Sequence, residues 1–216
     1  MYPVITISRE FGSGGHSIGM AVAEKLGIPF LDSKIVEEVA KESGFAKEYV
    51  KEQDEMATYP ELFITSNIFS TNYLDTPQEQ IQQLQSEYII EQAKKGPCVI
   101  AGRCADYVLE NAGIPALNVF IHASMEYRKK RVLEVYGETD VKIEKRIEKK
   151  DKGRKSYYRY YTDRKFGDAK NYALCLNSGI LGIDKCIDFI IDVAENFNND
   201  WLFFKSKKQP LFALVN

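Results

Sequence analysis

The chain has 216 residues, 44% of them hydrophobic and 28% charged, which is enough for one well-buried core and too few for two. We therefore expect one domain spanning residues 1–216. The formal net charge of −2 gives no reason to expect nucleic acid or an anionic membrane as a partner. Residues 128–165, however, contain 15 Lys and Arg against 7 Asp and Glu, so this segment carries +8 and the remainder −10. The segment is suited to contact anions.

The cysteines and the apolar runs indicate the compartment. The four cysteines stand singly, without the short paired spacing of a zinc site, and the N-terminus shows no basic-then-apolar signal sequence. The longest apolar runs have the length of strands and fall far below the roughly 20 residues that span a bilayer. We expect a cytoplasmic protein with reduced thiols and no membrane segment.

The first fifty residues alternate between strand and helix patterns. The β-branched run Val4–Ile7 predicts a strand, and apolar residues at helical spacing after a glycine-rich turn predict a helix that ends at Gly27. Residues 28–31 predict a second strand, and residues 35–44 a second amphipathic helix. This rhythm is typical of βαβ units.

The remaining pattern completes an α/β protein. Residues 45–95 begin irregularly and end in a Gln-rich helix, so they are predicted to form an insert. Residues 141–165 are a charged helical stretch with few apolar residues, which predicts a solvated arm. Strands are predicted at 98–101, 117–121 and 172–176, and helices at 77–95 and 183–193. The predicted fold class is α/β with three layers, in which helices cover both faces of a parallel sheet of about five strands.

The turn after the first strand has the composition of a phosphate-binding loop. Its glycines allow consecutive backbone N–H groups to face inward, and the following helix adds its positive N-terminal end. A turn that merely connects strand and helix is the plainer alternative, but the place after the first strand favours phosphate binding. For one member, His16, a simple first-turn role is an equal alternative. The residues predicted to bind the nucleotide are Gly12, Ser13, Gly14, Gly15, His16 and Ser17.

This loop departs from the standard P-loop motif. When Ser17 is aligned with the Ser or Thr that usually holds magnesium, Gly15 occupies the position of the lysine and Arg9 that of the first glycine. Another cation could replace the lysine, with Arg9, Arg128 and Arg131 as candidates. Alternatively, the protein binds nucleotide without efficient chemistry.

A dinucleotide-binding Rossmann site is a weaker reading of the same residues. Gly12 and Gly14 open a helix, and Asp32 follows the second strand where a ribose-binding acid would lie. Ser17, however, takes the place of the third glycine, and hydride transfer has no use for a long basic segment. Such a segment does have a use in kinases.

These stretches together resemble the cytidylate kinase-like family, a branch of P-loop enzymes related to bacterial cytidylate kinases. The resemblance covers nearly the whole chain. It rests on ITISREFGSGGHSIG at 5–19, PFLD at 29–32, VIAGRCADYVL at 99–109 and VFIHASMEYRKKRV at 119–132. It implies a P-loop kinase fold in which residues 45–95 are a helical acceptor-binding insert and residues 141–165 a helical lid.

The resemblance also implies roles for two residues in binding the acceptor. Asp32 matches an aspartate that leads into the acceptor site, and Arg103 matches an arginine that binds the acceptor phosphate. For Asp32 the plainer alternative is capping of the next helix. Two departures affect the acceptor: Cys104 replaces an aspartate, and the lid is poorer in arginine than that of cytidylate kinases.

Phosphoryl transfer requires positioned cations rather than a covalent nucleophile. We expect ATP as donor, Mg²⁺ held in part by Ser17, and a small acceptor, with a nucleoside monophosphate such as CMP as the first candidate. Arg128 and Arg131 lie three residues apart and share a helix face, although a solvated Arg-Lys-Lys-Arg surface is the plainer alternative. The residues predicted to be catalytic are Arg9, Arg128, Arg131 and Arg154.

Two other functions stay open. A catalytically silent nucleotide-binding regulator would explain the missing lysine, and a kinase with a non-nucleotide acceptor would share the donor site. Nucleotide and small acceptor are the expected partners, without nucleic acid or membrane. The apolar tail at residues 201–204 suggests a homo-oligomer contact.

Overall fold

The computed structural model describes residues 2–32, 35 and 77–197. Its centre is a five-stranded sheet in which every pair of neighbours is parallel, in the order β2-β3-β1-β4-β5. This confirms the predicted α/β fold with a parallel sheet of about five strands. The strands are β1 (Val4–Arg9), β2 (Phe30–Leu31), β3 (Val99–Ala101), β4 (Ala116–His122) and β5 (Leu174–Asn177).

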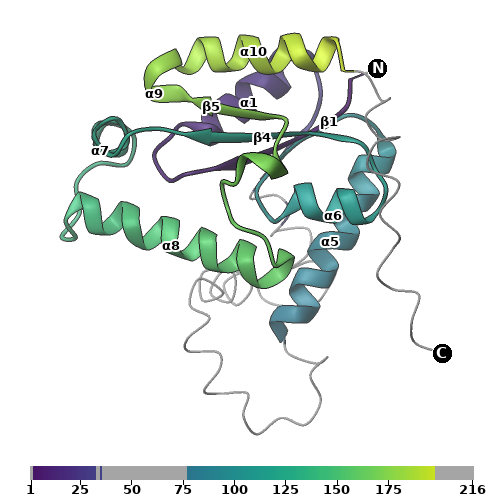
Figure 1. Ribbon diagram of the computed structural model, residues 1–216, viewed down its shortest axis with the longest axis horizontal. Coiled ribbons are helices and arrows are strands. Elements are labelled where there is room, and N and C mark those ends of the chain that lie inside the picture. Colours follow the sequence, from purple (N-terminus) through teal and green to yellow (C-terminus); the bar gives the residue numbers. More distant parts are fainter. Residues whose placement is uncertain (1, 33–34, 36–76, 198–216) are drawn as a thin grey trace, which may run out of the picture.

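Helices cover both faces of the sheet, which gives three layers (Figure 1). Helices α1 and α10 lie on one face, and α5, α6 and α8 lie on the other. The helices are α1 (Gly15–Leu26), α5 (Pro77–Lys95), α6 (Ala105–Asn111), α7 (Met125–Tyr136), α8 (Ile143–Thr162), the 3-10 helix η1 (Ala169–Asn171), α9 (Ser178–Leu181) and α10 (Ile183–Glu195).

The sheet separates two apolar clusters, as expected for parallel strands buried on both faces. In β1, Ile5 and Ile7 pack with α1 and α10, whereas Val4 belongs to the cluster with α5 and α6. Ile7 pairs with Ala101 of β3 and with Val119 of β4. Because all strands run the same way, their carboxyl ends and the loops that follow them gather at one edge.

Two strands begin two residues later than predicted, for local reasons. The predicted strand at 28–31 is reduced to Phe30–Leu31, because the Ile28 N–H donates to the Ala23 carbonyl and extends the end of α1. The predicted strand at 172–176 begins instead at Leu174, because the Tyr172 N–H donates to Ala169 and closes η1. In both cases a helix end takes the first residues of the expected strand.

The predicted solvated arm is one helix, α8, with a buried face. Ile147, Asp151 and Tyr158 are among its buried residues. Of the predicted insert, only residues 77–95 are described, as α5. The rest of the insert, residues 36–44 of the helix expected at 35–44, and the apolar tail lie outside the described residues. None of the helices in the described ranges combines the length and apolarity needed to cross a membrane.

Candidate functional site

The loop between β1 and α1 is curled, and hydrogen bonds to neighbouring elements fix its conformation. Gly12 and Gly14 adopt φ angles of +82° and +83°, which glycine reaches at no steric cost. The Ser13 hydroxyl contacts two carbonyl oxygens, those of Glu10 at 2.9 Å and Ile121 at 3.1 Å, and the Ser178 hydroxyl donates to the Ser13 carbonyl at 2.6 Å. These contacts tie the loop to the end of β4 and to α9.

The N-terminus of α1 suits an anion. Gly14 is the N-cap residue and offers no side-chain hydrogen bond to the first turn. The first N–H groups of a helix have no partner within the helix, and the positive end of the helix dipole lies beside them. The predicted phosphate-binding residues Gly12–Ser17 thus lie together at the start of α1, with Ser13 and Gly15 buried and His16 exposed.

Gly15 leaves no room for a lysine in the present arrangement. A Cβ at this position would lie 2.5 Å from the Arg9 Cβ and 3.0 Å from its Cγ. The Arg9 side chain occupies this space and extends toward the end of β3, where its guanidinium lies against Gly102. Arg9 thus places a cation beside the loop that lacks the usual one.

Asp32, at the end of β2, joins this cation to the loop. One carboxylate oxygen lies 3.6 Å from Arg9 Nη2, and the other lies 2.9 Å from His16 Nε2. The Asp32 side chain is 25% exposed, so it is partly accessible to solvent. The structure therefore brings together Arg9, His16 and Asp32, which come from three different elements.

Two further arginines approach the same place. The Arg154 guanidinium of α8 donates to the Arg9 carbonyl at 3.0 Å. Burial lowers the pKa of Arg154 to about 9, and the Arg9 charge acts in the same direction. Burial also lowers the pKa of Arg9, with Asp32 opposing this shift and the Arg103 charge adding to it. This crowding of positive charge would be relieved by a bound anion.

Arg103 lies in an unusual backbone conformation. Gly102, Arg103 and Cys104 have successive φ angles of +85°, +58° and +54°. For residues other than glycine this left-handed conformation costs about 1–3 kcal/mol each, and such strain concentrates at functional sites. Arg103 lies in the turn that leads from the end of β3 into α6. The family resemblance pointed to Arg103, but nothing in the sequence indicated this backbone conformation.

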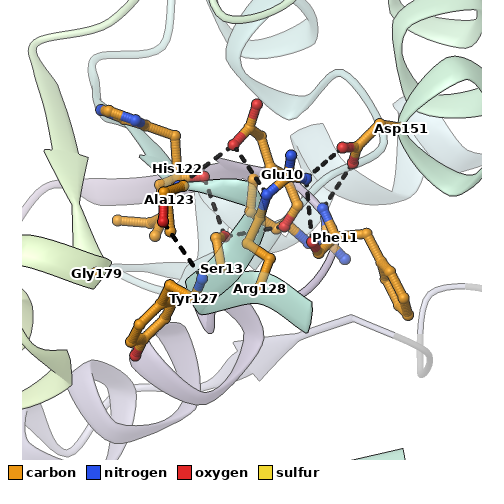
Figure 2. Close-up of polar contacts among 12 residues, drawn as sticks. Glu10, Phe11, Ser13, His122, Ala123, Tyr127, Arg128, Asp151 and Gly179 are labelled. Carbon is orange, nitrogen blue, oxygen red and sulfur yellow. Dashed lines mark hydrogen bonds and ion pairs between the residues drawn. The ribbon is translucent and has the colours of Figure 1, made fainter. Parts of the chain in front are cut away.

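Arg128 lies behind the loop, in a buried ion pair (Figure 2). Its guanidinium contacts the Asp151 carboxylate and donates to the Phe11 carbonyl at 3.3 Å, and its Nε lies 3.6 Å from Glu10. Asp151 also accepts the Phe11 N–H at 2.7 Å. The side chains of Arg128 and Asp151 are each 8% exposed. Arg128 and Asp151 thus connect α7 and α8 to the backbone of the loop.

Arg131 lies over the other end of the loop. Its Nη2 donates to the Ser17 hydroxyl at 2.9 Å, and its Nε lies 3.1 Å from the place where a Cβ on Gly14 would stand. Arg128 and Arg131 therefore contact different residues at and beside the loop rather than one common point. Glu10 and Asp151, which support Arg128, were not predicted as site residues.

The described residues contain no group of three His, Cys, Asp or Glu that could hold a metal. Mg²⁺ in phosphoryl-transfer sites is usually bound by one or two protein groups together with phosphates and water. The Ser17 hydroxyl has two acceptor lone pairs, and its contact with Arg131 needs only one of them. The site therefore fits a cation held mainly by the nucleotide.

A parallel sheet with a phosphate loop after its first strand and basic groups around it defines the class of P-loop phosphotransferases. Residues 4–180 match the cytidylate kinase-like family. The cytidylate kinase of Archaeoglobus fulgidus is 26% identical over 197 residues, which cover 88% of this chain and 94% of that protein. The crystal structure of an uncharacterized protein from Eubacterium ventriosum has a TM-score of 0.67 and 28% identity, covering 89% of this chain and 98% of that one.

The chain therefore belongs to the cytidylate kinase-like family. This confirms the predicted family and the P-loop kinase fold, and it supports a kinase as the general class of enzyme. The identity of the acceptor, the metal and the roles of individual residues stay predictions.

Proposed function

We propose that this protein transfers the terminal phosphoryl group of ATP to a nucleoside monophosphate, with CMP as the first candidate. The observation that carries the proposal is the convergence of Arg9 and Arg154 beside the phosphate loop, with the Arg103 charge near Arg9. Three guanidinium groups in one partly buried place are suited to the charge of a migrating phosphoryl group.

The donor is proposed to lie along the start of α1. The N–H groups of Gly12–Ser17 would hold its β-phosphate, and Arg131 would contact the phosphates from the side of Gly14. Mg²⁺ would supply further neutralisation of the phosphate charge, held by Ser17 and the phosphates. His16, which pairs with Asp32, would bring the donor and acceptor sides of the site together.

Arg9 is proposed to take the part of the missing lysine. Its aliphatic stem fills the space beside Gly15, and its guanidinium extends toward the ends of β2 and β3. From there it can reach a phosphate that lies between donor and acceptor. Arg103 would bind the acceptor phosphate, because paired N–H groups of arginine match a phosphate bidentately.

Arg128 is proposed to position the loop, because its side chain is buried and contacts Asp151, Glu10 and the Phe11 carbonyl. Its ion pair with Asp151 places Arg154, one turn further along α8, over the Arg9 carbonyl. This role differs from the direct contact with the phosphoryl group that the sequence suggested, and kinetics of Arg128 variants can separate the two.

A silent nucleotide-binding protein is the second candidate, favoured by one observation. The Arg9 side chain closes the lysine position, so the standard donor contact cannot form there. A kinase with a non-nucleotide acceptor is the third, because P-loop kinases share the donor site and differ in what they phosphorylate.

The experiment is ADP formation from ATP and Mg²⁺ with CMP, dCMP and UMP as acceptors. We expect acceptor-dependent ADP. In Arg103→Ala the KM of the acceptor should rise by about tenfold or more, since a charged hydrogen bond contributes about 1.5–3 kcal/mol, while the Kd of ATP stays within about twofold. Lys25→Ala, a change at an exposed lysine on α1, is the control.

Each other outcome decides between the candidates. ATP that raises the melting temperature without turnover of any acceptor would favour the silent nucleotide-binding protein or a different acceptor. Equal loss of ATP and acceptor binding in Arg103→Ala would remove its proposed role. Absence of any nucleotide binding would refute the phosphate-loop assignment itself.

A further inference from the structure

We propose that a cavity between α8 and the ends of β4 and β5 is a second ligand site, which takes a small phosphorylated or carboxylated molecule bearing an aromatic ring. The cavity has a volume of about 670 Å³, within the usual range for small-molecule sites. Four of its lining residues are cationic, and its walls include two phenylalanines and a histidine.

The cations come from one short stretch of chain. Lys155 and Arg159 lie four residues apart on α8, so they share a helix face, and Arg164 and Lys165 follow the end of that helix. The carboxylate of Glu10 is the single acidic group among the lining residues, and it lies against Arg128.

Part of this positive charge is already balanced. Arg164 pairs with Glu110 at 2.8 Å, and Arg159 pairs with Asp163 at 3.1 Å. Within the described ranges, Lys155 and Lys165 have no acidic partner. A cavity with two such ammonium groups and further guanidinium groups attracts a ligand with at least one negative charge.

The floor of the cavity is aromatic. Phe120 is 6% exposed, and Phe166 meets its ring edge-on at a centroid distance of 5.2 Å. The His122 ring stacks on Phe120 at 6.2 Å. Gly167 has a φ angle of +76° and passes so close to Phe120 that an added Cβ would lie 2.9 Å from its ring. The backbone is thus fitted to the ring, and a flat ligand ring could pack beside these groups.

This site touches the phosphate loop through Glu10, the first residue of the loop, but lies on the other face of the sheet from α1. In β4, Val119 and Ile121 face α1 and α10, whereas Phe120 packs on Phe166 and on Tyr172 on the opposite face of the sheet. The donor is proposed to bind at the start of α1, so the cavity is not needed for it. The inference therefore goes beyond the proposed phosphoryl transfer and does not depend on it.

Isothermal titration in 0.15 M salt tests the proposal, with phenyl phosphate, inorganic phosphate and phenol as probes. Phosphate could also enter the loop, so the informative quantity is the part of the binding that is lost in Lys155→Glu/Arg159→Glu. We expect wild-type protein to bind phenyl phosphate about tenfold more tightly than inorganic phosphate, and this double variant to lose about tenfold or more.

The matched control is Lys145→Glu/Lys149→Glu, which reverses two charges at the same spacing on the same helix but outside the cavity. It should change binding by less than about twofold, because exposed charges are screened over about 8 Å at this salt concentration. Phe166→Leu should abolish the preference for phenyl phosphate while inorganic phosphate still binds. Lys155→Ala provides a milder variant should the double reversal impair folding.

Three results would overturn the proposal. Equal binding by wild-type protein and Lys155→Glu/Arg159→Glu would show that the cavity takes no anion. An equal loss in the control variant would assign the binding to diffuse positive charge on α8. Equal affinity for phenyl phosphate and inorganic phosphate would remove the aromatic part of the site.

Discussion

At the scale of single residues, Gly15 shows how a substituted motif can remain compatible with its loop. Its absent side chain makes room for the stem of Arg9, which lies in the preceding strand. The two positions therefore depend on each other: a side chain at residue 15 requires Arg9 to move. Under the proposed function, a cation at residue 9 and a glycine at residue 15 would together replace a lysine at residue 15.

We predict that Gly15→Ala destabilises the protein by about 1–3 kcal/mol, the usual cost of overpacking, although alanine favours a helix. The cost should largely disappear in an Arg9→Gly background. Glycine is needed at residue 9 because the nearest obstacle is the Arg9 Cβ, which alanine would retain. Urea unfolding of the two single variants and the double variant measures this coupling. The same cost in both backgrounds would show that Arg9 is not the obstacle.

At the scale of elements, α8 connects the phosphate loop to α6. Its middle is attached to the loop through Asp151 and Arg154, and its last turns are attached to α6, where the Tyr158 hydroxyl donates to Asp106 at 2.6 Å. Burial raises the pKa of Asp106. A helix held at both places can transmit its position to the loop.

We predict that Asp151→Ala destabilises the protein by about 3–5 kcal/mol, because it leaves the buried Arg128 without its closest partner and the Phe11 N–H without its acceptor. Arg128→Met/Asp151→Leu should recover most of this stability but still bind nucleotide less tightly, since the loop has lost its support. Urea unfolding and ATP titration measure the two effects separately.

The control for that pair is Glu144→Ala, which breaks an exposed ion pair with Lys129 between the same two helices. Exposed pairs contribute little, so the urea midpoint should hardly change. A loss comparable to that of Asp151→Ala would mean that any contact between α7 and α8 has the same weight, and the buried pair would have no special role.

The same elements show what the sequence could predict. Buried parallel strands have apolar runs, and a phosphate loop needs glycines, so β1 and the loop were predicted from residue types alone. The Arg128–Asp151 pair joins residues that are 23 positions apart and lie in different helices. The sequence alone does not show that these two side chains meet in space. Two further features also depend on how helices and strands pack against each other. They are the position of the Arg9 side chain beside Gly15 and the cavity between α8 and the ends of β4 and β5.

At the scale of the whole molecule, the charge is divided between two parts of the chain. The total is −2, yet residues 128–165, which include most of α7 and all of α8, carry +8. Cations from this segment approach the phosphate loop from two sides, through Arg131 on α7 and Arg154 on α8. An anion that approaches the loop therefore meets a local positive field, although the protein as a whole is slightly acidic.

We predict that the association rate of MgATP falls by roughly tenfold or less when salt rises from about 20 mM to about 300 mM, because the Debye length shortens and the steering field is screened. Lys130→Glu/Lys145→Glu should slow association at low salt, leave it unchanged at high salt, and leave dissociation unchanged in both, since the changed lysines are exposed positions of α7 and α8. Stopped-flow measurement with a fluorescent ATP analogue separates the two rates. Two results would contradict this prediction: an association rate that is independent of salt, or a double variant that changes only the dissociation rate. Either would show that the basic segment acts only through direct contacts with the bound nucleotide.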